Sequence, residues 1–333
     1  MQSTNKSGND KREFVFAADL GGTHLRAAAV DRGGELYFRQ MQPTPQAETP
    51  DEIVRALIAA VRECERQLGE LGGAISGVSI AVPGTVNVAK GIVVQAPNVP
   101  SLDGFHLGAA LASELNRPLI LENDANAAAL GDMWRGAGQG CRSIICVTLG
   151  TGVGGGIILD GKLWRGADGS AGEIGHIAVD PFSGVPCSCG GQGCLEVYAS
   201  ATAIVRMTRE AKPRYPYSAL HNPEDLTSEK IYQAGKEGDE LALEVFRQMG
   251  VYLGIGLASL INVINPEVIV VGGGLANGWD LFEKHMHQQI FERAFPIPAR
   301  RARIVRAQCG DDAGLLGAAW LAFATLNEKG RLV

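Results

Sequence analysis

The sequence predicts an α/β protein made of two similar domains that face each other across a cleft. Two stretches support this prediction, because each shows a strand, a tight turn rich in glycine and threonine, and further strands joined by a second turn. The first turn reads Leu20-Gly21-Gly22-Thr23, and the second reads Leu149-Gly150-Thr151-Gly152. Strands alternating with helices follow each copy, which is typical of the α/β class.

The length of 333 residues is enough for two domains with large cores. We expect a frayed polar tail over residues 1–12, a small N-terminal α/β domain over 13–124 and a larger C-terminal α/β domain over 125–315. The remaining segment, 316–333, is expected to be a helix that packs back on the N-terminal domain.

Composition narrows the class of protein. The net charge of −6 argues against a nucleic-acid partner. The polar start has no apolar segment of the kind that signal peptides carry, and no membrane partner is expected. Four of the seven cysteines (Cys64, Cys141, Cys146 and Cys309) are scattered without the spacing of a disulfide framework. That pattern suits a reducing, cytoplasmic location.

Hydrophobic periodicity predicts the main helices. In the first half, helices are expected over Pro50 to Leu68 and Leu107 to Leu115. In the second half, we expect one helix over Val197 to Arg209 and two separate helices over Leu241 to Met249 and Val251 to Ile264.

The two glycine turns are the first candidate binding elements. Backbone N–H groups and the Thr23 hydroxyl in the first turn suit a phosphate group, and Asp19 is placed to orient a hydrated Mg²⁺. The first turn alone fits an ordinary glycine hairpin equally well. The pair favours a nucleotide phosphate chain held between two turns. Farther on, a buried strand runs into Gly272-Gly273-Gly274, where a flat ring such as adenine can approach the backbone.

Polar residues follow a second predicted strand, at Asn123 and Asp124. Ligands of open α/β sheets sit at the carboxyl ends of strands, which makes Asp124 a candidate functional carboxylate. The alternative is that Asp124 only caps the alanine-rich helix that follows. Another strand ends at Pro83-Gly84, a turn that usually just reverses the chain but can also line a cleft.

One histidine and three cysteines form the candidate metal site: His176, Cys187, Cys189 and Cys194. Three thiolates and an imidazole are a common tetrahedral ligand set for zinc. A disulfide and unrelated buried thiols are the alternatives, but Cys187 and Cys189 are too close in sequence for an easy bridge, and three is an odd number. The spacing therefore favours a structural zinc ion, which leaves the flanking Glu173 and Glu196 free for another role.

Taken together, these motifs resemble the ROK family (repressors, open reading frames and sugar kinases) of the actin-like ATPase superfamily. The resemblance rests on D-L-G-G-T-H-L-R, E-N-D-A-N-A-A-A-L-G, T-L-G-T-G-V-G-G-G, G-E-I-G-H, C-x-C-G-x-x-G-C-L-E and V-I-V-V-G-G-G-L, and it runs from about Phe14 to Ala324. The pattern is most similar to the family's bacterial ATP-dependent glucokinases. The resemblance implies the duplicated actin-like ATPase (ribonuclease H-like) fold, with ATP, Mg²⁺ and structural Zn²⁺ as cofactors.

The resemblance also implies roles for individual residues. Asp124 matches the general base that accepts a proton from the attacking sugar hydroxyl. The positions expected on the sugar side are Gly84, Asn98, Asn123, Asp124, Glu173, His176 and Glu196. The positions expected on the nucleotide side are Asp19, Gly21, Gly22, Thr23, Gly150, Thr151, Gly152, Gly273 and Gly274. Zinc on one nitrogen of His176 would fix the ring for a sugar contact by the other. Loss of the metal is expected to spare the nucleotide turns, which are far away in sequence.

The resemblance leaves the sugar open. Phosphorylation of the 6-hydroxyl of glucose is expected, and N-acetylglucosamine, N-acetylmannosamine, mannose, allose and fructose are alternatives. Polyphosphate is a possible second donor. A DNA-binding repressor is disfavoured, because few residues precede Asp19 and the net charge is negative. A non-catalytic sugar-sensing protein is disfavoured by the presence of both phosphate turns and Asp124. A homodimer, or a dimer of dimers, is implied by the resemblance; the sequence offers only the apolar segment Val251 to Leu260, which fits a core equally well.

Overall fold

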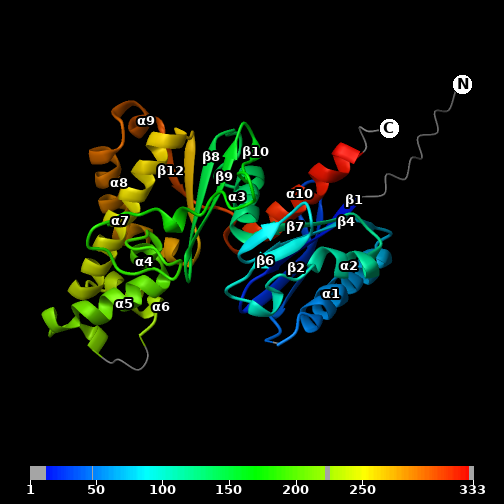
Figure 1. Ribbon diagram of the computed structural model, residues 1–333, viewed down its shortest axis with the longest axis horizontal. Helices are drawn as coiled ribbons and strands as arrows, with labels where there is room; N and C mark the ends of the chain where they lie inside the picture. Colours follow the sequence, from blue (N-terminus) through cyan, green and yellow to red (C-terminus); the bar gives the residue numbers. More distant parts are fainter. Residues whose placement is uncertain (1–12, 47, 222–225, 330–333) are drawn as a thin grey trace, which may run out of the picture. The chain divides into compact units, whose positions relative to one another are not determined.

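The structure is a computed structural model that describes residues 13–46, 48–221 and 226–329. The chain divides into two compact units, which Figure 1 colours along the sequence. Unit 1 comprises Met1–Ala127 and Gly314–Val333, and unit 2 comprises Ala128–Ala313. The tail expected over residues 1–12 lies outside the described residues.

Unit 1 contains a five-stranded mixed sheet in the order β3-β2-β1-β4-β7. The strands β1 and β2, and β2 and β3, pair antiparallel, whereas β4 is parallel to both β1 and β7. The strands of this unit are β1 (Glu13–Leu20), β2 (His24–Asp31), β3 (Leu36–Pro43), β4 (Ala74–Val82), β5 (Thr85–Asn87), β6 (Ile92–Gln95) and β7 (Leu119–Asn123). Its helices are α1 (Asp51–Glu70), α2 (Leu107–Leu115), α10 (Ala313–Lys329) and the start of α3 (Asp124–Arg135).

Alternation along β1 explains why both faces of this sheet are covered. Phe14 and Phe16 join the hydrophobic core that includes Leu57 and Val61 of α1, while Val15, which points to the other face, is also fully buried. On that other face α10 approaches closely enough that a Cβ atom at Gly77 of β4 would contact Leu326. A strand buried on both faces reads as a continuous apolar run, as the sequence showed.

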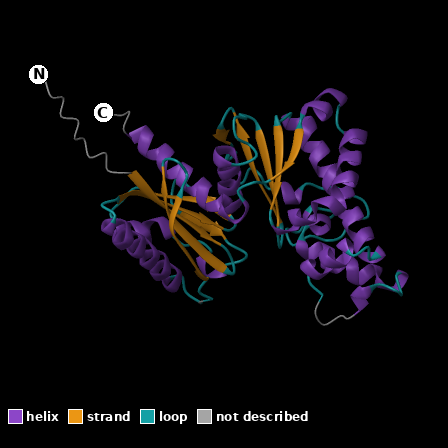
Figure 2. Ribbon diagram, turned by 180° about the vertical axis from the view of Figure 1, so that it is seen from behind, coloured by secondary structure: helices purple, strands orange, loops and turns teal. Residues whose placement is uncertain are grey.

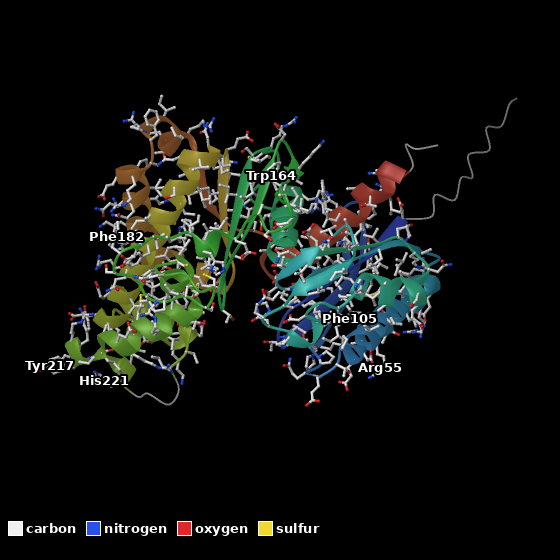
Figure 3. All side chains as sticks on the ribbon, in the orientation of Figure 1. Arg55, Phe105, Trp164, Phe182, Tyr217 and His221 are labelled. Carbon is white, nitrogen blue, oxygen red and sulfur yellow. The ribbon has the colours of Figure 1, made fainter. Side chains whose placement is uncertain are left out.

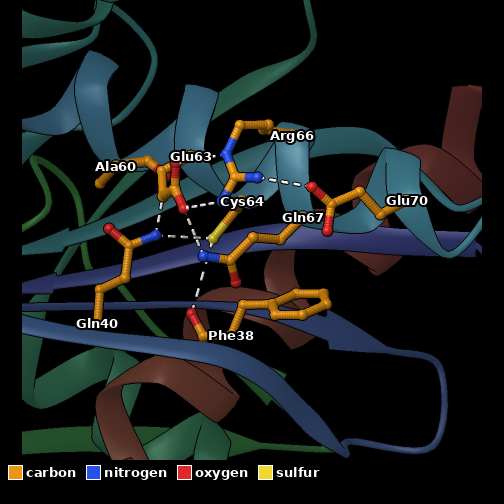
Figure 4. Close-up of polar contacts among 8 residues, drawn as sticks. All are labelled: Phe38, Gln40, Ala60, Glu63, Cys64, Arg66, Gln67 and Glu70. Atoms are coloured by element: carbon orange, nitrogen blue, oxygen red, sulfur yellow. Dashed lines mark hydrogen bonds and ion pairs between the residues drawn. The ribbon is translucent and has the colours of Figure 1, made fainter.

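The amphipathic helix α1 is joined to β3 by polar contacts at its margin (Figure 4). The Gln40 side-chain amide donates to the carbonyl of Ala60 and contacts the Cys64 sulfur. Nearby, Arg66 forms ion pairs with Glu63 and Glu70 one turn away on the same helix. Exposed pairs of this type stabilise a helix by about 0.3–0.5 kcal/mol each, so burial of the apolar face, not charge, holds α1 on the sheet.

Unit 2 repeats the architecture of unit 1. Its sheet has the order β10-β9-β8-β11-β12, with β9 antiparallel to β10 and β8, and with β11 parallel to β8 and β12. The strands are β8 (Ile144–Leu149), β9 (Val153–Leu159), β10 (Lys162–Leu163), β11 (Val268–Gly272) and β12 (Arg303–Arg306). The helices are α4 (Glu196–Ala199), α5 (Ala201–Ala211), α6 (Ser228–Lys236), α7 (Glu240–Ile264), α8 (Trp279–Arg293) and α9 (Pro296–Arg301). The equivalent strand orders confirm the predicted duplication of an α/β unit.

The long helix α7 packs against α8, and its buried residues join those of β8 and β11 in the unit 2 core. Figure 2 shows helices beside the sheet of each unit. The prediction of two helices meeting near Gly250 was wrong, because α7 runs unbroken from Glu240 to Ile264. Gly250 serves packing instead: a Cβ atom there would lie 2.5 Å from the carbonyl oxygen of Phe282 in α8. Although α7 is apolar and long enough to cross a membrane, 61% of its most apolar window is buried in the protein, as in the core helix of a soluble protein.

The single helix predicted after Glu196 is two helices. The chain breaks at Ser200, whose extended backbone (φ −100°, ψ 165°) separates α4 from α5. The Ser200 hydroxyl accepts a hydrogen bond from the N–H of Ala203, which is an N-cap of α5. Periodicity alone could not reveal this break, because both helices present their apolar residues to the same core.

Candidate active site

Several candidate residues of unit 1 lie at one edge of its sheet. Asp19 is near the carboxyl end of β1, Gly84 follows β4, and Asn123 ends β7. These three strands run parallel, with Asp19 paired to Ala81 and Val82 paired to Asn123. Parallel strands bring their carboxyl ends to the same edge, which is where open α/β sheets bind ligands.

Asn123 holds the carboxylate of Asp124 in place. Its side-chain N–H₂ group donates to the carbonyl oxygen of Gly84 at 2.9 Å and to Oδ1 of Asp124 at 3.0 Å. Its own Oδ1 accepts from the N–H of Asn126 at 2.9 Å, which caps α3. Both amide hydrogens are therefore engaged, and Asn123 can offer another ligand only a lone pair on its oxygen.

The Asp124 carboxyl is partly buried at the first position of α3. Burial, together with the nearby negative charge of Asp19, raises the pKa of Asp124 to about 7. Hydrogen bonds from Asn123 and from the N–H of Ala125 oppose that shift. A carboxylate with a pKa near neutrality is suited to accept a proton, so Asp124 stays the candidate functional carboxylate.

In the first glycine turn, the carbonyl oxygens accept hydrogen bonds from residues outside the turn. Thr44 donates through its hydroxyl to the carbonyl of Gly21 and through its N–H to that of Thr23, at 2.6 and 2.8 Å. Gln46 donates to the carbonyl of Gly22 at 2.9 Å. Within the described part of the chain, the N–H groups of Gly22 and Thr23 have no protein acceptor. An anion binds to a turn through backbone N–H groups that no carbonyl oxygen occupies, so these two N–H groups suit an anion.

Two further residues lie against this turn. A Cβ atom at Gly22 would come within 2.9 Å of the Asn98 Cβ, so Asn98 closes directly on the turn. A Cβ atom at Gly314 would come within 2.8 Å of the Asp19 carboxylate, which places Asp19 against the first turn of α10. The positive end of the helix dipole favours a charged carboxylate at that position.

The second glycine turn, in unit 2, is braced in the same way. The N–H of Ala201 donates to the carbonyl of Gly150 at 2.8 Å, and the Thr202 hydroxyl donates to that of Thr151 at 2.9 Å. Among the described residues, the N–H groups of Thr151 and Gly152 have no protein acceptor. Each unit therefore has one braced glycine turn whose N–H groups suit an anion. The bracing residues Thr44, Thr202 and Gln46 were missed, because nothing near the turns in sequence marks them.

A pocket of about 290 Å³ opens beside the second turn, entirely within unit 2. It is lined by Gly150, Thr151, Ala201, Ser228, Glu229, Tyr232, Phe246, Gly274, Leu275, Asn277 and Gly278. Of the two predicted glycines, Gly274 lines the pocket, and Gly273 packs on the backbone of Leu149 behind the turn. The aromatic wall was missed, because Tyr232 and Phe246 read in sequence as ordinary apolar positions of two helices.

The four predicted metal ligands meet in unit 2, with their donor atoms all within 4.8 Å of one another. The Cys187 sulfur lies 3.6 Å from Nδ1 of His176, and the sulfurs of Cys189 and Cys194 are 3.7 Å apart. Ligands of a tetrahedral zinc ion, at about 2.0–2.3 Å from the metal, are separated by about 3.4–3.8 Å. The donor set and its spacing therefore fit zinc.

The candidate metal-binding loop, from Asp180 to Cys194, carries the three cysteines and is anchored on the core. Tyr198 donates to Asp180 at the start of the loop and accepts from the N–H of Val185, while its ring stacks on Tyr252 of α7 at 3.8 Å between centroids. By contrast, Phe182 within the loop is 94% exposed (Figure 3). On the other side of the cluster, Nε2 of His176 lies 3.9 Å from the Glu173 carboxylate, so the nitrogen not turned to the sulfurs faces Glu173.

Glu196 was expected on the sugar side, and the structure connects it to the second turn as well. Its Oε2 accepts from the N–H of Val153 at 2.9 Å, and a Cβ atom at Gly152 would lie 2.3 Å from that oxygen. Glu196 follows Cys194 by two residues, so this hydrogen bond links the stretch after the cysteines to the second turn.

Comparison with known proteins decides the family. The ROK family model matches residues 15–325, nearly the whole chain. The chain belongs to the ROK family. It is 37% identical over 323 residues to a glucokinase of Halalkalibacterium halodurans, covering 95% of this chain and 98% of that one.

Solved structures of ROK proteins agree. A ROK glucokinase from Streptomyces griseus, in complex with glucose and AMPPNP, is 35% identical, with a TM-score of 0.79 and coverage of 93% of this chain and 99% of that one. A ROK hexokinase from Thermus thermophilus is 33% identical, with a TM-score of 0.79 and coverage of 95% and 99%. The fold is therefore the duplicated actin-like ATPase fold that the ROK motifs predicted.

Proposed function

We propose that this ROK protein is a sugar kinase that transfers the γ-phosphoryl group of ATP to the 6-hydroxyl of glucose. The observation that carries the proposal is Asp124, a carboxylate with a pKa raised to about 7, at the ligand-binding edge of a sheet that also presents an anion-binding turn. Glucokinases at 33–37% identity over more than nine-tenths of the chain support glucose as the acceptor.

In the proposed reaction Asp124 is the general base. As the sugar oxygen attacks the γ-phosphorus, the O–H proton moves to the Asp124 carboxylate, the bond from the γ-phosphorus to the bridging oxygen of ATP breaks, and ADP leaves. Hydrogen bonds from Asn123 and Ala125 fix the Oδ1 atom of the base, so the other carboxylate oxygen is the one that takes the proton. The products are glucose 6-phosphate and ADP.

The proposed sugar contacts are the positions that the family motifs imply. Gly84, Asn98 and Asn123 contribute from unit 1, and Glu173, His176 and Glu196 from unit 2. Sugar hydroxyls donate hydrogen bonds, so carboxylates and amide oxygens suit them as acceptors. Because its amide hydrogens are engaged, Asn123 would accept from the sugar rather than donate to it.

Each braced turn is proposed to be a phosphate-binding element of the nucleotide site: Gly21, Gly22 and Thr23 in unit 1, and Gly150, Thr151 and Gly152 in unit 2. The adenine ring fits the pocket walled by Tyr232 and Phe246, next to Gly274. Mg²⁺ bound to the phosphates neutralises charge that develops in the transition state, and Asp19 is placed to orient its water ligands. The binding of Zn²⁺ by His176 and the three cysteines would be structural, fixing the His176 ring so that its other nitrogen meets the sugar.

The pKa of Asp124 gives a pH prediction. The base works only when deprotonated, so kcat/KM for glucose should fall about tenfold for each pH unit below a pKa near 7. Ionisation of this partly buried carboxyl also costs stability, since its folded-state pKa is raised, and this cost grows between pH 4 and 7. A pH–rate profile measured at saturating ATP checks the first point. An activity that stays constant down to pH 5 would refute the assignment of the base.

A homodimer is proposed on unit 2, though not through the segment expected from sequence. Val251 to Leu260 is mostly buried core, whereas Val263, Phe291, Phe295 and Ile297 are 59–79% exposed where α7, α8 and α9 meet. An apolar patch of this kind marks an interface. We expect a dimer in sedimentation equilibrium at micromolar concentration and a shift to monomer on Phe295→Asp. A monomeric wild-type protein would contradict the proposal.

Cytoplasmic location is proposed from seven unpaired cysteines and from the use of ATP.

A coupled ADP-release assay with a panel of hexoses tests the function directly. Glucose is expected to give the highest kcat/KM among glucose, mannose, fructose, allose, N-acetylglucosamine and N-acetylmannosamine. Polyphosphate in place of ATP tests the donor. If none of the hexoses in the panel caused ADP release, a non-catalytic, sugar-sensing protein would be favoured over a kinase.

A further inference from the structure

Glu196 contacts the second phosphate turn in a way that its sugar-side role does not require. Its Oε2 accepts from the N–H of Val153, the residue that closes the turn Gly150-Thr151-Gly152. The fit is tight, because a Cβ atom at Gly152 would lie 2.3 Å from Oε2 and 3.2 Å from Cδ. A side chain at position 152 would push the end of Glu196 aside, so glycine at this point of the turn lets the carboxylate lie against it.

The duplicated architecture makes this contact informative. In unit 1 the turn has its own carboxylate, Asp19, directly before Leu20. The corresponding residue of unit 2 is Thr148, directly before Leu149. The second turn takes its carboxylate instead from Glu196, which follows the metal-binding loop. Two other bonds, from Ala201 and Thr202, tie the same stretch of chain to the carbonyls of Gly150 and Thr151.

We infer that Glu196 is a positioning residue that couples sugar binding to nucleotide binding, one oxygen holding the phosphate turn and the other accepting from the sugar. The inference rests on the proposed kinase function. A carboxylate beside an anion-binding turn repels phosphate, and a hydroxyl that donates to its second oxygen withdraws part of that charge and fixes its rotamer. Sugar thereby favours nucleotide binding, and by linkage nucleotide favours sugar binding to the same degree.

The coupling is measured by titrating AMPPNP·Mg²⁺ calorimetrically into the full-length protein, with and without saturating glucose. For the wild type, glucose should lower the Kd for AMPPNP by about fivefold or more. Glu196→Gln has one acceptor oxygen instead of two, so it can serve the turn or the sugar but not both, and the ratio of the two Kd values should fall to near one. Glu196→Asp keeps the charge but is shorter by one methylene, and it should lose the coupling as well.

Two controls make the test specific. Glu173→Gln changes a proposed sugar contact with no bond to the turn, so it should raise the Kd for glucose and keep the wild-type coupling ratio at saturation. Glu210→Gln removes one member of a surface ion pair with Arg206 on α5, and it should change neither the Kd for glucose nor the coupling ratio. Melting temperature and zinc content establish that each variant is folded. If Glu196→Gln does not fold, the coupling is tested with Glu196→Asp alone.

A wild-type ratio near one, or a wild-type ratio retained by a folded Glu196 variant, would overturn the coupling. Failure of the proposed function looks different: the wild type would bind no AMPPNP or release no ADP with any hexose. The two outcomes are therefore distinguishable in the same set of samples.

Discussion

Replacement of Asp124 by asparagine is expected to lower kcat by roughly 10²–10⁴-fold, because an amide cannot accept the proton of the sugar hydroxyl. The fold should survive, since asparagine keeps an oxygen for the hydrogen bonds from Asn123 and the N–H of Ala125. Above pH 7 the variant should even melt at a higher temperature than the wild type. It removes an ionised carboxyl that Asp19 repels and that is partly desolvated.

The measurement pairs steady-state kinetics with thermal unfolding at pH 8 and pH 5. Glucose affinity, read by calorimetry, should change little, which separates loss of the base from loss of the pocket. Asp103→Asn serves as a matched control, because Asp103 caps a loop at Ala96 in the same unit and has no proposed part in the chemistry. If Asp124→Asn retained more than about a tenth of the wild-type kcat, another group would have to be the base.

Substitution of Cys189 by serine is expected to reduce bound zinc from one ion per chain towards none, because a serine hydroxyl is a poor zinc ligand at neutral pH. Cys189 is the exposed member of the cluster, so the change leaves the apolar core untouched. The melting temperature should fall by roughly 5 °C or more. KM for glucose should rise more than KM for ATP, since His176 is itself a proposed ligand, whereas the second turn is reached indirectly through Glu196, Ala201 and Thr202.

Elemental analysis, thermal unfolding and kinetics on one preparation provide the check. Cys141→Ser is the matched control, because Cys141 lies outside the cluster and should keep a full complement of metal. A zinc-free variant with the stability and the glucose KM of the wild type would show that something other than metal positions His176.

Sequence patterns predicted the duplicated fold and identified the histidine and three cysteines whose donor atoms cluster in the structure. Both depend on local signals: a period-2 apolar run, a glycine turn, and the spacing of three cysteines. The patterns failed where long-range packing decides. Gly250 looked like the end of a helix and is instead a contact with α8. Ser200 looked like part of a helix and is a cap between two.

The same limit applies to the site. The positions of Asp124 and the two turns follow from where strands end, which the sequence shows. Other features depend on residues that are distant in sequence. Asn123 donates both amide hydrogens, to Gly84 and to Asp124, and Thr44 and Thr202 brace the two turns. Distance in sequence also concealed the hydrogen bond between Glu196 and Val153, which links the residues after the cysteine cluster to the second glycine turn.

The discontinuity of unit 1 has a consequence for biosynthesis. Its last helix, α10, is made only after the whole of Ala128–Ala313 has been translated, because synthesis proceeds from the N-terminus. Until then one face of the unit 1 sheet lacks the helix that contacts Gly77, and Asp19 lacks the helix start at Gly314. Unit 2 is continuous and can complete its core first. Unit 2 can therefore complete its glycine turn before α10 reaches unit 1, and the proposed phosphoryl transfer would need this late-made helix.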